Sequence, residues 1–266
     1  MAFLDELFAT LWSDHAALTP QAARLHQLLR ERGDAVRIDH VALLTFDLPG
    51  VEIEALDRAF VAHGYQAAQS YELPAAGLTA YHYEHADDAR RPKLLLGAVL
   101  VDELSGPARE IVRGLVGRVE PGASAHPLFA ASGRRWTLSS SDYRILSEEN
   151  QHAAWVAAFG FRAHHVAVDV GELRTFEGLG ELDRFLEQHG FRIDQAGGAI
   201  KGSPDELLEQ SSTLPDEIDV ELSDGALRIP SGCCVLARRY PGPDGTLYQG
   251  YAAEPAARLF PAAGLG

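Results

Sequence analysis

The segment RIDHVALLTFD, residues 37–47, decides the fold because the chain carries a second copy of it, RAHHVAVDVGE, at residues 162–172. The segment that follows is also repeated, as ALDRAFVAHGYQAAQ at 55–69 and ELDRFLEQHGFRIDQ at 181–195. The strand-like segments match at an offset of 125 residues and the helix-like segments at 126, as a one-residue loop insertion would produce. So many matches in one order indicate an internal duplication.

Each copy has the pattern of a buried strand, a helix and about three further strands. The strand candidates are QSYEL, GLTAYHYEH and PKLLLGAVLV in the first copy, and FRIDQAGG, EIDVELSD, GALRIP and GCCVLARRY in the second. We predict an α+β fold in which two tandem βαβββ-like modules, residues 36–103 and 160–252, enclose a central cavity. N-terminal helices (1–35) and a helical insert between the modules (104–159) complete a single domain over 1–266, and a short helix is expected in the C-terminal AAEPAARLFPAAGLG.

The composition favours a small-molecule partner. The 266 residues carry a formal charge of −15 with only 23 basic side chains, which argues against nucleic acid and against an anionic membrane surface. The cysteines, Cys233 and Cys234, are neighbours and cannot join distant segments, so a reducing compartment is expected. With no signal-like N-terminus, we expect a cytoplasmic protein; the oligomeric state stays open, a homo-oligomer included.

The duplication gives each module one histidine at its first strand, His40 and His165. Modules of this kind pair in vicinal oxygen chelate folds, where the first strands point side chains into a shared cavity. Imidazole is the commonest transition-metal ligand, and two of them with a carboxylate suit a non-haem Fe(II). A single strand histidine is more often a core residue than a ligand, and only the pairing of two favours a metal site.

The other histidines have simpler interpretations. Strand alternation predicts that His164 points to the face opposite His165. His63 and His189 precede a glycine at matching helix ends, where an imidazole favours the helix C-terminus. The unpaired His82, His85, His126 and His152 are expected to be packed or solvated.

Two polar segments are candidates for substrate contacts. QSST, Gln210 to Thr213, offers the amide of Gln210 and the hydroxyl of Ser212, either for a substrate carboxylate or as a turn, and we favour the turn. RRYPGPDGTLYQGY contains a Pro-Asp-Gly turn, and its Arg238 and Tyr248 line the cavity or lie on the surface.

A set of motifs in order and spacing resembles the DUF1338 family. The motifs are RIDHVALLTF, AYHYEH with RPKLLLGAVLVDELS, AAWVAAFGFRAHHVAV, LLEQSST, and IPSGCCVLARRYP with GTLYQGY, and they span about residues 35 to 260. Characterised members of that family are 2-oxoadipate dioxygenase/decarboxylases, also called hydroxyglutarate synthases. The resemblance implies Fe(II) held by two histidines and one glutamate, and a reaction in which O₂ is activated and a 2-oxo acid is decarboxylated and hydroxylated.

Carried over by position, the two histidine ligands fall on His40 and His165, but two other matches fail. Leu44 stands where the family pattern has an arginine suited to a substrate carboxylate, and Val235 stands where it has the metal glutamate. A third departure is GAV, Gly97 to Val99, where many relatives have a serine and a glutamate. The implied pocket is therefore less polar, with Leu44, Gln210, Ser212, Val235, Arg238 and Tyr248 as its substrate-side candidates.

Two functions of different class follow. The first is a 2-oxoadipate dioxygenase/decarboxylase-like enzyme with altered substrate recognition, whose metal takes its third ligand from elsewhere, with Asp219 and Glu221 as candidates, or from substrate and water. The second is a metal-free small-molecule binding protein, or a cofactor-independent enzyme, in which the two histidines act as hydrogen-bonding or acid–base groups. A purely structural protein is disfavoured by the retained histidine pair.

Overall fold

A computed structural model describes residues 2–251, 260 and 261 of the chain. The helices are α1 (Ala2–Leu18), α2 (Pro20–Glu31), α3 (Ile53–Val61), α4 (Gly106–Val116), α5 (Ser140–Glu149), α6 (Gln151–Phe159) and α7 (Leu179–Gln188). The strands are β1 (Ile38–Phe46), β2 (Tyr65–Leu73), β3 (Leu78–His85), β4 (Lys93–Val99), β5 (Ala163–Asp169), β6 (Lys201–Ser203), β7 (Leu208–Ser212), β8 (Glu217–Leu222), β9 (Gly225–Pro230) and β10 (Cys234–Arg239). The short C-terminal helix expected from the sequence lies mostly outside the described residues.

Within the described residues one sheet has eight strands in the order β2-β3-β4-β1-β5-β10-β7-β6. The order is the same outward from the central β1–β5 pair in both directions: a parallel neighbour (β4 or β10), then two antiparallel strands. This is the arrangement that two βαβββ modules give when their first strands pair. The predicted α+β fold class, with a curved sheet built from two related halves, is confirmed.

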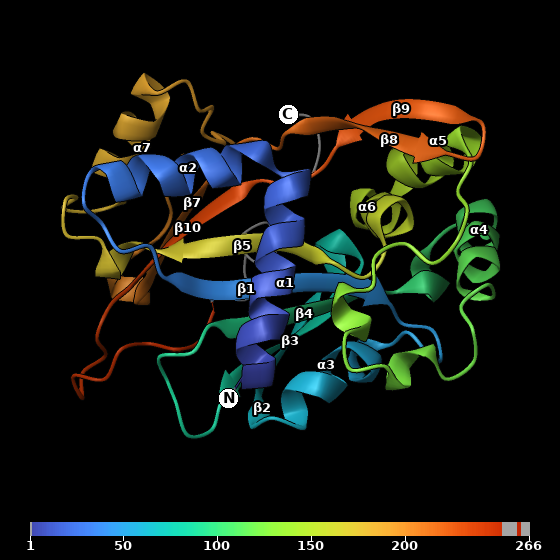
Figure 1. The fold of residues 1–266 in the computed structure, drawn as a ribbon, viewed down its shortest axis with the longest axis horizontal. Helices are drawn as coiled ribbons and strands as arrows, with labels where there is room; N and C mark the ends of the chain where they lie inside the picture. Colours follow the sequence, from blue (N-terminus) through green and yellow to red (C-terminus); the bar gives the residue numbers. More distant parts are fainter. Residues whose placement is uncertain (1, 252–259, 262–266) are drawn as a thin grey trace.

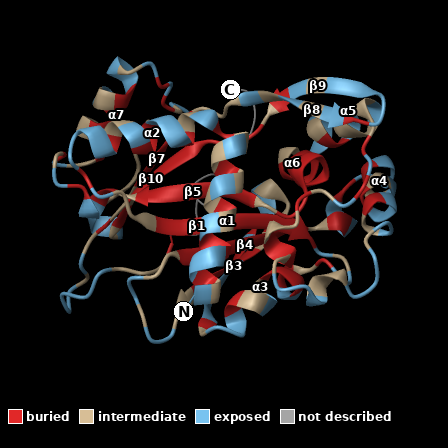
Figure 2. Ribbon diagram, viewed as in Figure 1, coloured by how far each residue is buried: buried red, intermediate tan, exposed pale blue. Residues whose placement is uncertain are grey.

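Helices cover one face of this sheet. In Figure 1, α1 crosses in front of the central strands and α2 lies crosswise to it at the upper left. Helix α3 packs on β4, and α7 packs on β7 and β10. The central strands β4, β1, β5 and β10 are buried almost throughout, and the helices expose their outer surfaces (Figure 2). The repeat therefore buries a continuous apolar layer on the helical face and leaves the other face free to form a site.

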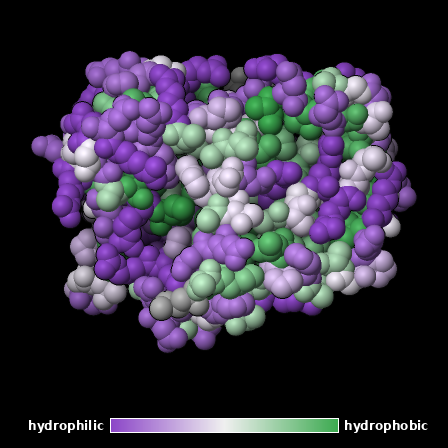
Figure 3. Space-filling model, in the orientation of Figure 1, coloured by the Kyte–Doolittle hydropathy of each residue, from purple (hydrophilic) through white to green (hydrophobic). Residues whose placement is uncertain are grey.

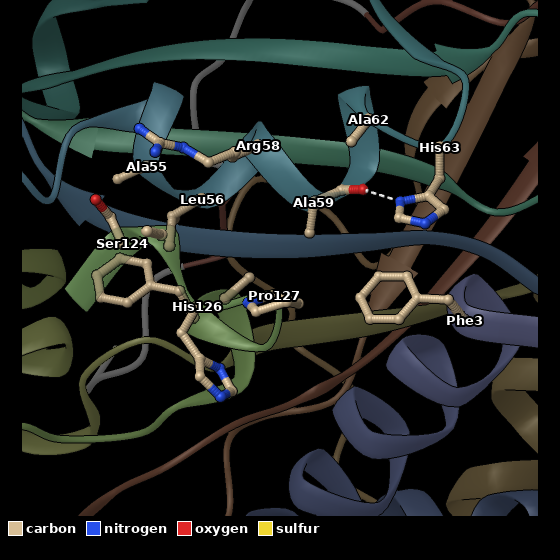
Figure 4. A pocket seen from close by; sticks show the side chains of 13 residues that line it. Phe3, Ala55, Leu56, Arg58, Ala59, Ala62, His63, Ser124, His126 and Pro127 are labelled. Atoms are coloured by element: carbon tan, nitrogen blue, oxygen red, sulfur yellow. Dashed lines mark hydrogen bonds between the residues drawn. The ribbon is translucent and has the colours of Figure 1, made fainter. Parts of the chain in front are cut away.

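The two helix ends that close the repeated helices are alike. His63 Nδ1 donates to the Ala59 carbonyl at 2.7 Å (Figure 4), and His189 Nδ1 donates to the Phe185 carbonyl at 2.8 Å. Each histidine side chain donates to a carbonyl of the last helical turn, and a glycine at positive φ follows it in both copies. The capping role predicted for both histidines is confirmed.

Two local predictions in the second module are wrong, and a third is confirmed only as to secondary structure. FRIDQAGG forms only an isolated bridge between Ile193 and Thr213, because Gly197 and Gly198 both take positive φ and turn the chain before it reaches β6. EIDVELSD and GALRIP form a separate hairpin, β8–β9, and do not join the large sheet. QSST is not a turn: residues 210–212 lie in β7 and pair with β10.

The helical side of the molecule is mainly hydrophilic, with apolar patches over its right half (Figure 3). That surface agrees with the formal charge of −15. Over the described residues, none of the helices combines the length and the apolar character that crossing a membrane requires.

Candidate functional site

The site is centred on the two repeated histidines. β1 and β5 are antiparallel neighbours, and their register sets His40 opposite Ala167 and His165 opposite Ala42. The two imidazoles thus sit on one face at diagonal positions, with their Nε2 atoms 3.2 Å apart and their ring planes nearly perpendicular. Both residues are completely buried. The structure therefore brings the two predicted metal ligands together at the centre of the sheet.

A buried ion pair of Asp39 and Arg239 orients His40 through the ring nitrogen that does not face His165. Asp39 Oδ1 lies 2.6 Å from His40 Nδ1, and Arg239 of β10 binds the same carboxylate through two hydrogen bonds, from Nε at 2.6 Å and from Nη2 at 3.0 Å. A register irregularity between residues 38 and 40 lets Asp39 share a face with His40. Arg239 is held in turn, because its Nη1 donates to the carbonyl oxygens of Tyr248 and Gly250. The orientation of the His40 ring is thereby fixed.

His165 is supported differently, by the histidine beside it. His164 Nδ1 lies 3.0 Å from His165 Nδ1, so one ring donates and the other accepts. As alternation predicts, the His164 ring turns toward the helices and packs against Trp155 of α6, with centroids 4.8 Å apart. The prediction did not include the contact between the two neighbouring rings.

The electrostatics keep both imidazoles neutral. Burial lowers the pKa of His40, and Asp39 only partly opposes that effect. Burial together with the neighbouring rings of His40 and His164 holds the pKa of His165 well below its usual value. Burial acts to raise the pKa of Asp39, but Arg239 and the hydrogen bond from His40 outweigh it, so the pKa lies well below the usual range. Two neutral imidazoles beside a fixed carboxylate suit metal binding or proton exchange.

A wall of polar aromatic side chains flanks His40. The Tyr251 ring lies edge-on to His40 with centroids 5.3 Å apart, and its centroid is 5.4 Å from that of His82. His82 itself is buried, and its two nitrogens meet Tyr71 Oη at 2.8 Å and Glu84 Oε1 at 3.0 Å. His82 was expected to be packed or solvated, and it is packed, but beside the site.

The other end of the site is apolar. Leu44 and Gly97 are opposite each other in the β1–β4 register, and the Leu44 side chain and the Phe260 ring both lie against Gly97. A Cβ built on Gly97 would lie 2.7 Å from Phe260 Cζ and 2.9 Å from Leu44 Cδ2, so no larger residue fits there as the chain stands. Phe260 is 1 % exposed and its ring also faces His165, with centroids 6.2 Å apart. An aliphatic side chain and a phenyl ring therefore fill the place of the expected arginine.

Val235 lies in the same cross-strand row as His40. The register runs from His40 to Ala167, from Ala167 to Val235 and from Val235 to Ser212. Val235 is buried and packs with Ala167 and Cys233, both on the same face. A carboxylate at Val235 would be level with the histidines, but an isopropyl group cannot bind a metal.

His40 and His165 can thus occupy two coordination positions of a metal, but Val235 supplies no ligand for the third. With metal–imidazole bonds of about 2.0–2.1 Å, two ligands at adjacent positions have nitrogens about 2.9–3.4 Å apart, and the 3.2 Å between His40 and His165 falls within that range. No group of three His, Cys, Asp or Glu side chains that could hold a metal occurs among residues 2–251, 260 and 261. Asp219 and Glu221 lie exposed on β8, in the separate hairpin, and do not supply the missing ligand.

The remaining substrate-side candidates divide between the two faces. Gln210 and Ser212 are buried on β7, and the Gln210 Nε2 has no hydrogen-bond partner among the described atoms. Tyr248 is partly buried beside Arg239. Arg238 lies on the opposite face, where it donates to the Glu177 carbonyl and stacks over Tyr240. The structure therefore brings Arg239, and not Arg238, to the histidines.

An apolar groove elsewhere is unrelated to this site. It lies between α3 and residues 123–130, with Phe3 stacked on His63 at one end (Figure 4). Its lining is almost entirely apolar and includes none of the residues around His40.

Comparison with known proteins gives this arrangement a context. A family profile described as 2-oxoadipate dioxygenase/decarboxylase matches residues 128–237. The chain is 28 % identical to the 2-oxoadipate dioxygenase/decarboxylase of Oryza sativa over 88 % of its own length and 70 % of that protein's. It is 29 % identical to the Arabidopsis thaliana protein of the same name, of which it spans 58 %. Both plant proteins are described as chloroplastic.

Solved structures of similar fold lead to the same group of proteins. A putative hydrolase from Shewanella frigidimarina is 40 % identical, with a TM-score of 0.88 over 94 % of this chain and 97 % of that one. Hydroxyglutarate synthase from Oryza sativa, solved with 2-oxoadipate, is 26 % identical with a TM-score of 0.91 over 98 % and 92 %. A putative glyoxalase superfamily protein from Ralstonia eutropha, 18 % identical, shares the fold with a TM-score of 0.79. In its sequence motifs and in its fold, this chain is therefore similar to the 2-oxoadipate dioxygenase/decarboxylases of the DUF1338 family and to their relatives.

Proposed function

We propose that this protein is an enzyme that acts on a 2-oxo acid or a related small molecule, as a dioxygenase/decarboxylase with altered substrate recognition. Its relatives from rice and Arabidopsis carry that activity in their names, and the rice structure contains 2-oxoadipate. We further propose that His40 and His165 hold Fe(II), with the remaining positions taken by substrate and water.

The observation that carries the proposal is the convergence of two buried Nε2 atoms. They are 3.2 Å apart, and the other nitrogen of each ring is fixed by a hydrogen bond, to Asp39 or to His164. Metal-binding histidines commonly have such a second partner, which sets the tautomer and the ring orientation. When bound there, Fe(II) would supply Lewis acidity and one-electron chemistry with O₂.

The chain's own residues then define what the site accepts. Burial of both imidazoles keeps bulk water away from the reacting groups. Leu44 and Phe260 present apolar surface next to His165, where a bidentate carboxylate contact is no longer available. We infer that the substrate group directed toward Leu44 is apolar, in contrast to the second carboxylate of 2-oxoadipate.

A second function, metal-free binding of a small molecule, is favoured by Val235. Without a carboxylate at this position a divalent metal loses one of three protein ligands and the charge that balances it. The two Nε2 atoms at 3.2 Å also satisfy each other when one ring donates and the other accepts. In that case the histidines act as hydrogen-bonding or acid–base groups on a bound metabolite.

Metal analysis decides between the two functions. Protein purified anaerobically with Fe(II) is expected to retain metal, to consume O₂ in the presence of a 2-oxo acid, and to lose both properties in His40→Ala. Metal content near zero that is unchanged by His40→Ala would exclude the metal enzyme. Thermal stabilisation by a 2-oxo acid in the presence of EDTA would then favour the binding protein.

A further inference from the structure

A second, polar cavity opens beside the ion pair that supports His40. Its volume is about 160 Å³, and it lies at the beginning of β1 and β4. The residues that line it are Arg37, Ile38, Asp39, Ala89, Arg90, Arg91, Lys93, Asp169, Glu172, Arg239, Leu247 and Gln249. Asp39 and Arg239 separate it from His40, so it is a neighbour of the histidine site and not part of it.

The lining is positive in a strongly negative protein. Five of the residues are basic and three are acidic, whereas the whole chain has 23 basic and 38 acidic side chains. Three of the five basic residues are already paired: Arg239 with Asp39, Arg37 with Glu172, and Arg91 with Asp5. A local excess of positive charge with low-dielectric walls attracts small anions.

Of the other two basic residues in the lining, Arg90 is exposed to solvent, whereas Lys93 is buried. It is only 6 % exposed, and across the described parts of the chain its ammonium group makes no hydrogen bond and no ion pair. Lys201, the other lysine of the sequence, is bound to Asp194 at 2.5 Å. Burial lowers the pKa of Lys93, with Asp39 opposing that effect. A buried ammonium that lines a cavity and has no partner lacks an anionic oxygen ligand.

We propose that this cavity binds a small carboxylic acid, with the Lys93 ammonium as its buried cationic partner. Lys93 is opposite His40 in the β1–β4 register and Gly97 is opposite Leu44, so the bound carboxylate lies outside the histidine site, on the side of His40 away from Leu44. It also lies beside Arg239, whose guanidinium holds Asp39 and through it His40. The inference goes beyond the proposed function, because it requires neither a metal nor a reaction.

The presence of only two lysines makes the proposal testable by nuclear magnetic resonance. Protein labelled with carbon-13 in lysine gives two side-chain ε signals, which the variant Lys201→Arg assigns. The probes are glutarate, 2-oxoadipate, neutral glutaramide and inorganic phosphate, each titrated at constant ionic strength with EDTA present. We expect the Lys93 signal alone to shift, with saturation, on addition of either carboxylic acid.

Three results would overturn the proposal: equal effects of glutarate and glutaramide, shifts of both lysine signals that stay linear with concentration, or a response to phosphate as strong as that to the carboxylic acids. Because EDTA removes metal from these titrations, a negative result would not count against the proposed oxygenase. A protein that binds no metal would likewise not count against this carboxylate site.

The variant Lys93→Met separates binding from packing. It removes an unpaired buried charge and keeps most of the side-chain volume, so the free protein is expected to melt at a higher temperature. At the same time its affinity for glutarate should fall at least tenfold, while Lys201→Met, which breaks an ion pair elsewhere, leaves that affinity unchanged. A lower melting temperature in Lys93→Met with unchanged glutarate affinity would assign Lys93 a packing role only.

Discussion

The two copies of the repeated strand place a histidine at the same point but support it in opposite ways. In the first copy the residue before the histidine is Asp39, which is bound to Arg239 and brings a charged pair into the sheet. In the second copy the residue before it is His164, a neutral ring among Trp155 and Phe260. The duplication thus retained the geometry of the imidazole pair while the groups behind it diverged.

This difference teaches that the two halves contribute unequally to the site. The first half supplies the Asp39 carboxylate, which is paired with Arg239 and partly opposes the lowering of the His40 pKa by burial. The second half supplies only neutral groups, and its buried histidines resist protonation. Substitutions in the first half should therefore change stability by leaving a buried charge unpaired. Substitutions of the buried histidines should change how stability depends on pH.

The largest expected effect follows removal of the charge partner in the first half. Arg239→Met leaves the Asp39 carboxylate buried and unpaired, and we expect a loss of about 3–5 kcal/mol in the free energy of unfolding. Urea denaturation measures it. The matched control is Arg238→Met, which removes a neighbouring arginine that is bound to one carbonyl on the other face and should cost less than about 1 kcal/mol. Similar losses in the two variants would contradict the asymmetry.

Acid should first affect the buried histidines His15 and His152, which lie near His164 behind the second copy of the strand. Burial lowers the pKa of His15 and of His152 to about 4, so the unfolded chain takes up protons below about pH 6.5 that the folded chain refuses. Stability is therefore full above that pH and falls as the pH drops toward 4, by about 1.4 kcal/mol per pH unit for each such histidine. The ion pair of Asp39 fails only at lower pH, because the pKa of that carboxyl lies well below its usual value.

Thermal melts from pH 8 to 3 measure this loss. The variant His15→Gln is expected to reduce the slope between pH 6.5 and 4 by about one proton. A slope that stays the same in the variant would show that His15 is not among the groups that take up the protons.

A carboxylate at Val235 would add charge to the second half. Val235→Glu is expected to raise the affinity for a divalent metal such as Co(II) by about 10–100-fold, because it is level with His40 in the cross-strand row. Without metal the variant should be less stable than the parent. Val235→Gln, which has nearly the same shape without the charge, should show neither the gain nor the metal-dependent stabilisation. Titration calorimetry provides the affinities.

The smallest expected effects are at the helix ends, where the two copies have not diverged. Replacing His63 or His189 with alanine removes one hydrogen bond to a terminal carbonyl, and each change should cost about 0.5–1 kcal/mol. Equal losses in the two variants would show that this part of the repeat still works identically in both halves. A loss several times larger in one of them would show divergence here as well.

The sequence predicts the fold well because the repeat carries it. The offset of the two strand copies places His40 and His165 at equivalent positions, and the antiparallel pairing of β1 with β5 then brings them together. The second module was less predictable, since Gly197 and Gly198 interrupt a strand that is hydrophobic enough to form. Positive φ at a glycine depends on the surrounding turn, which a local pattern does not reveal.

The support of the site was largely missed. Asp39 stands next to His40 in the sequence and could have been noticed, but its partner Arg239 is 200 residues away and adjoins an equally basic Arg238. Only the strand register decides which of the two arginines faces inward. Phe260 gave no signal at all, because its role depends on the missing side chain at Gly97.

The contact of Leu44, Gly97 and Phe260 has a consequence for the history of the family. Each of the three leaves room for the others, so restoring an arginine at Leu44 alone would drive a charged group against a phenyl ring. Such a reversal is blocked until position 260 changes, and a change at 260 first would leave a cavity with nothing to fill it. Single substitutions therefore do not readily convert this set of three residues into one that contains an arginine. Proteins that descend from this chain should keep all three residues or replace them together.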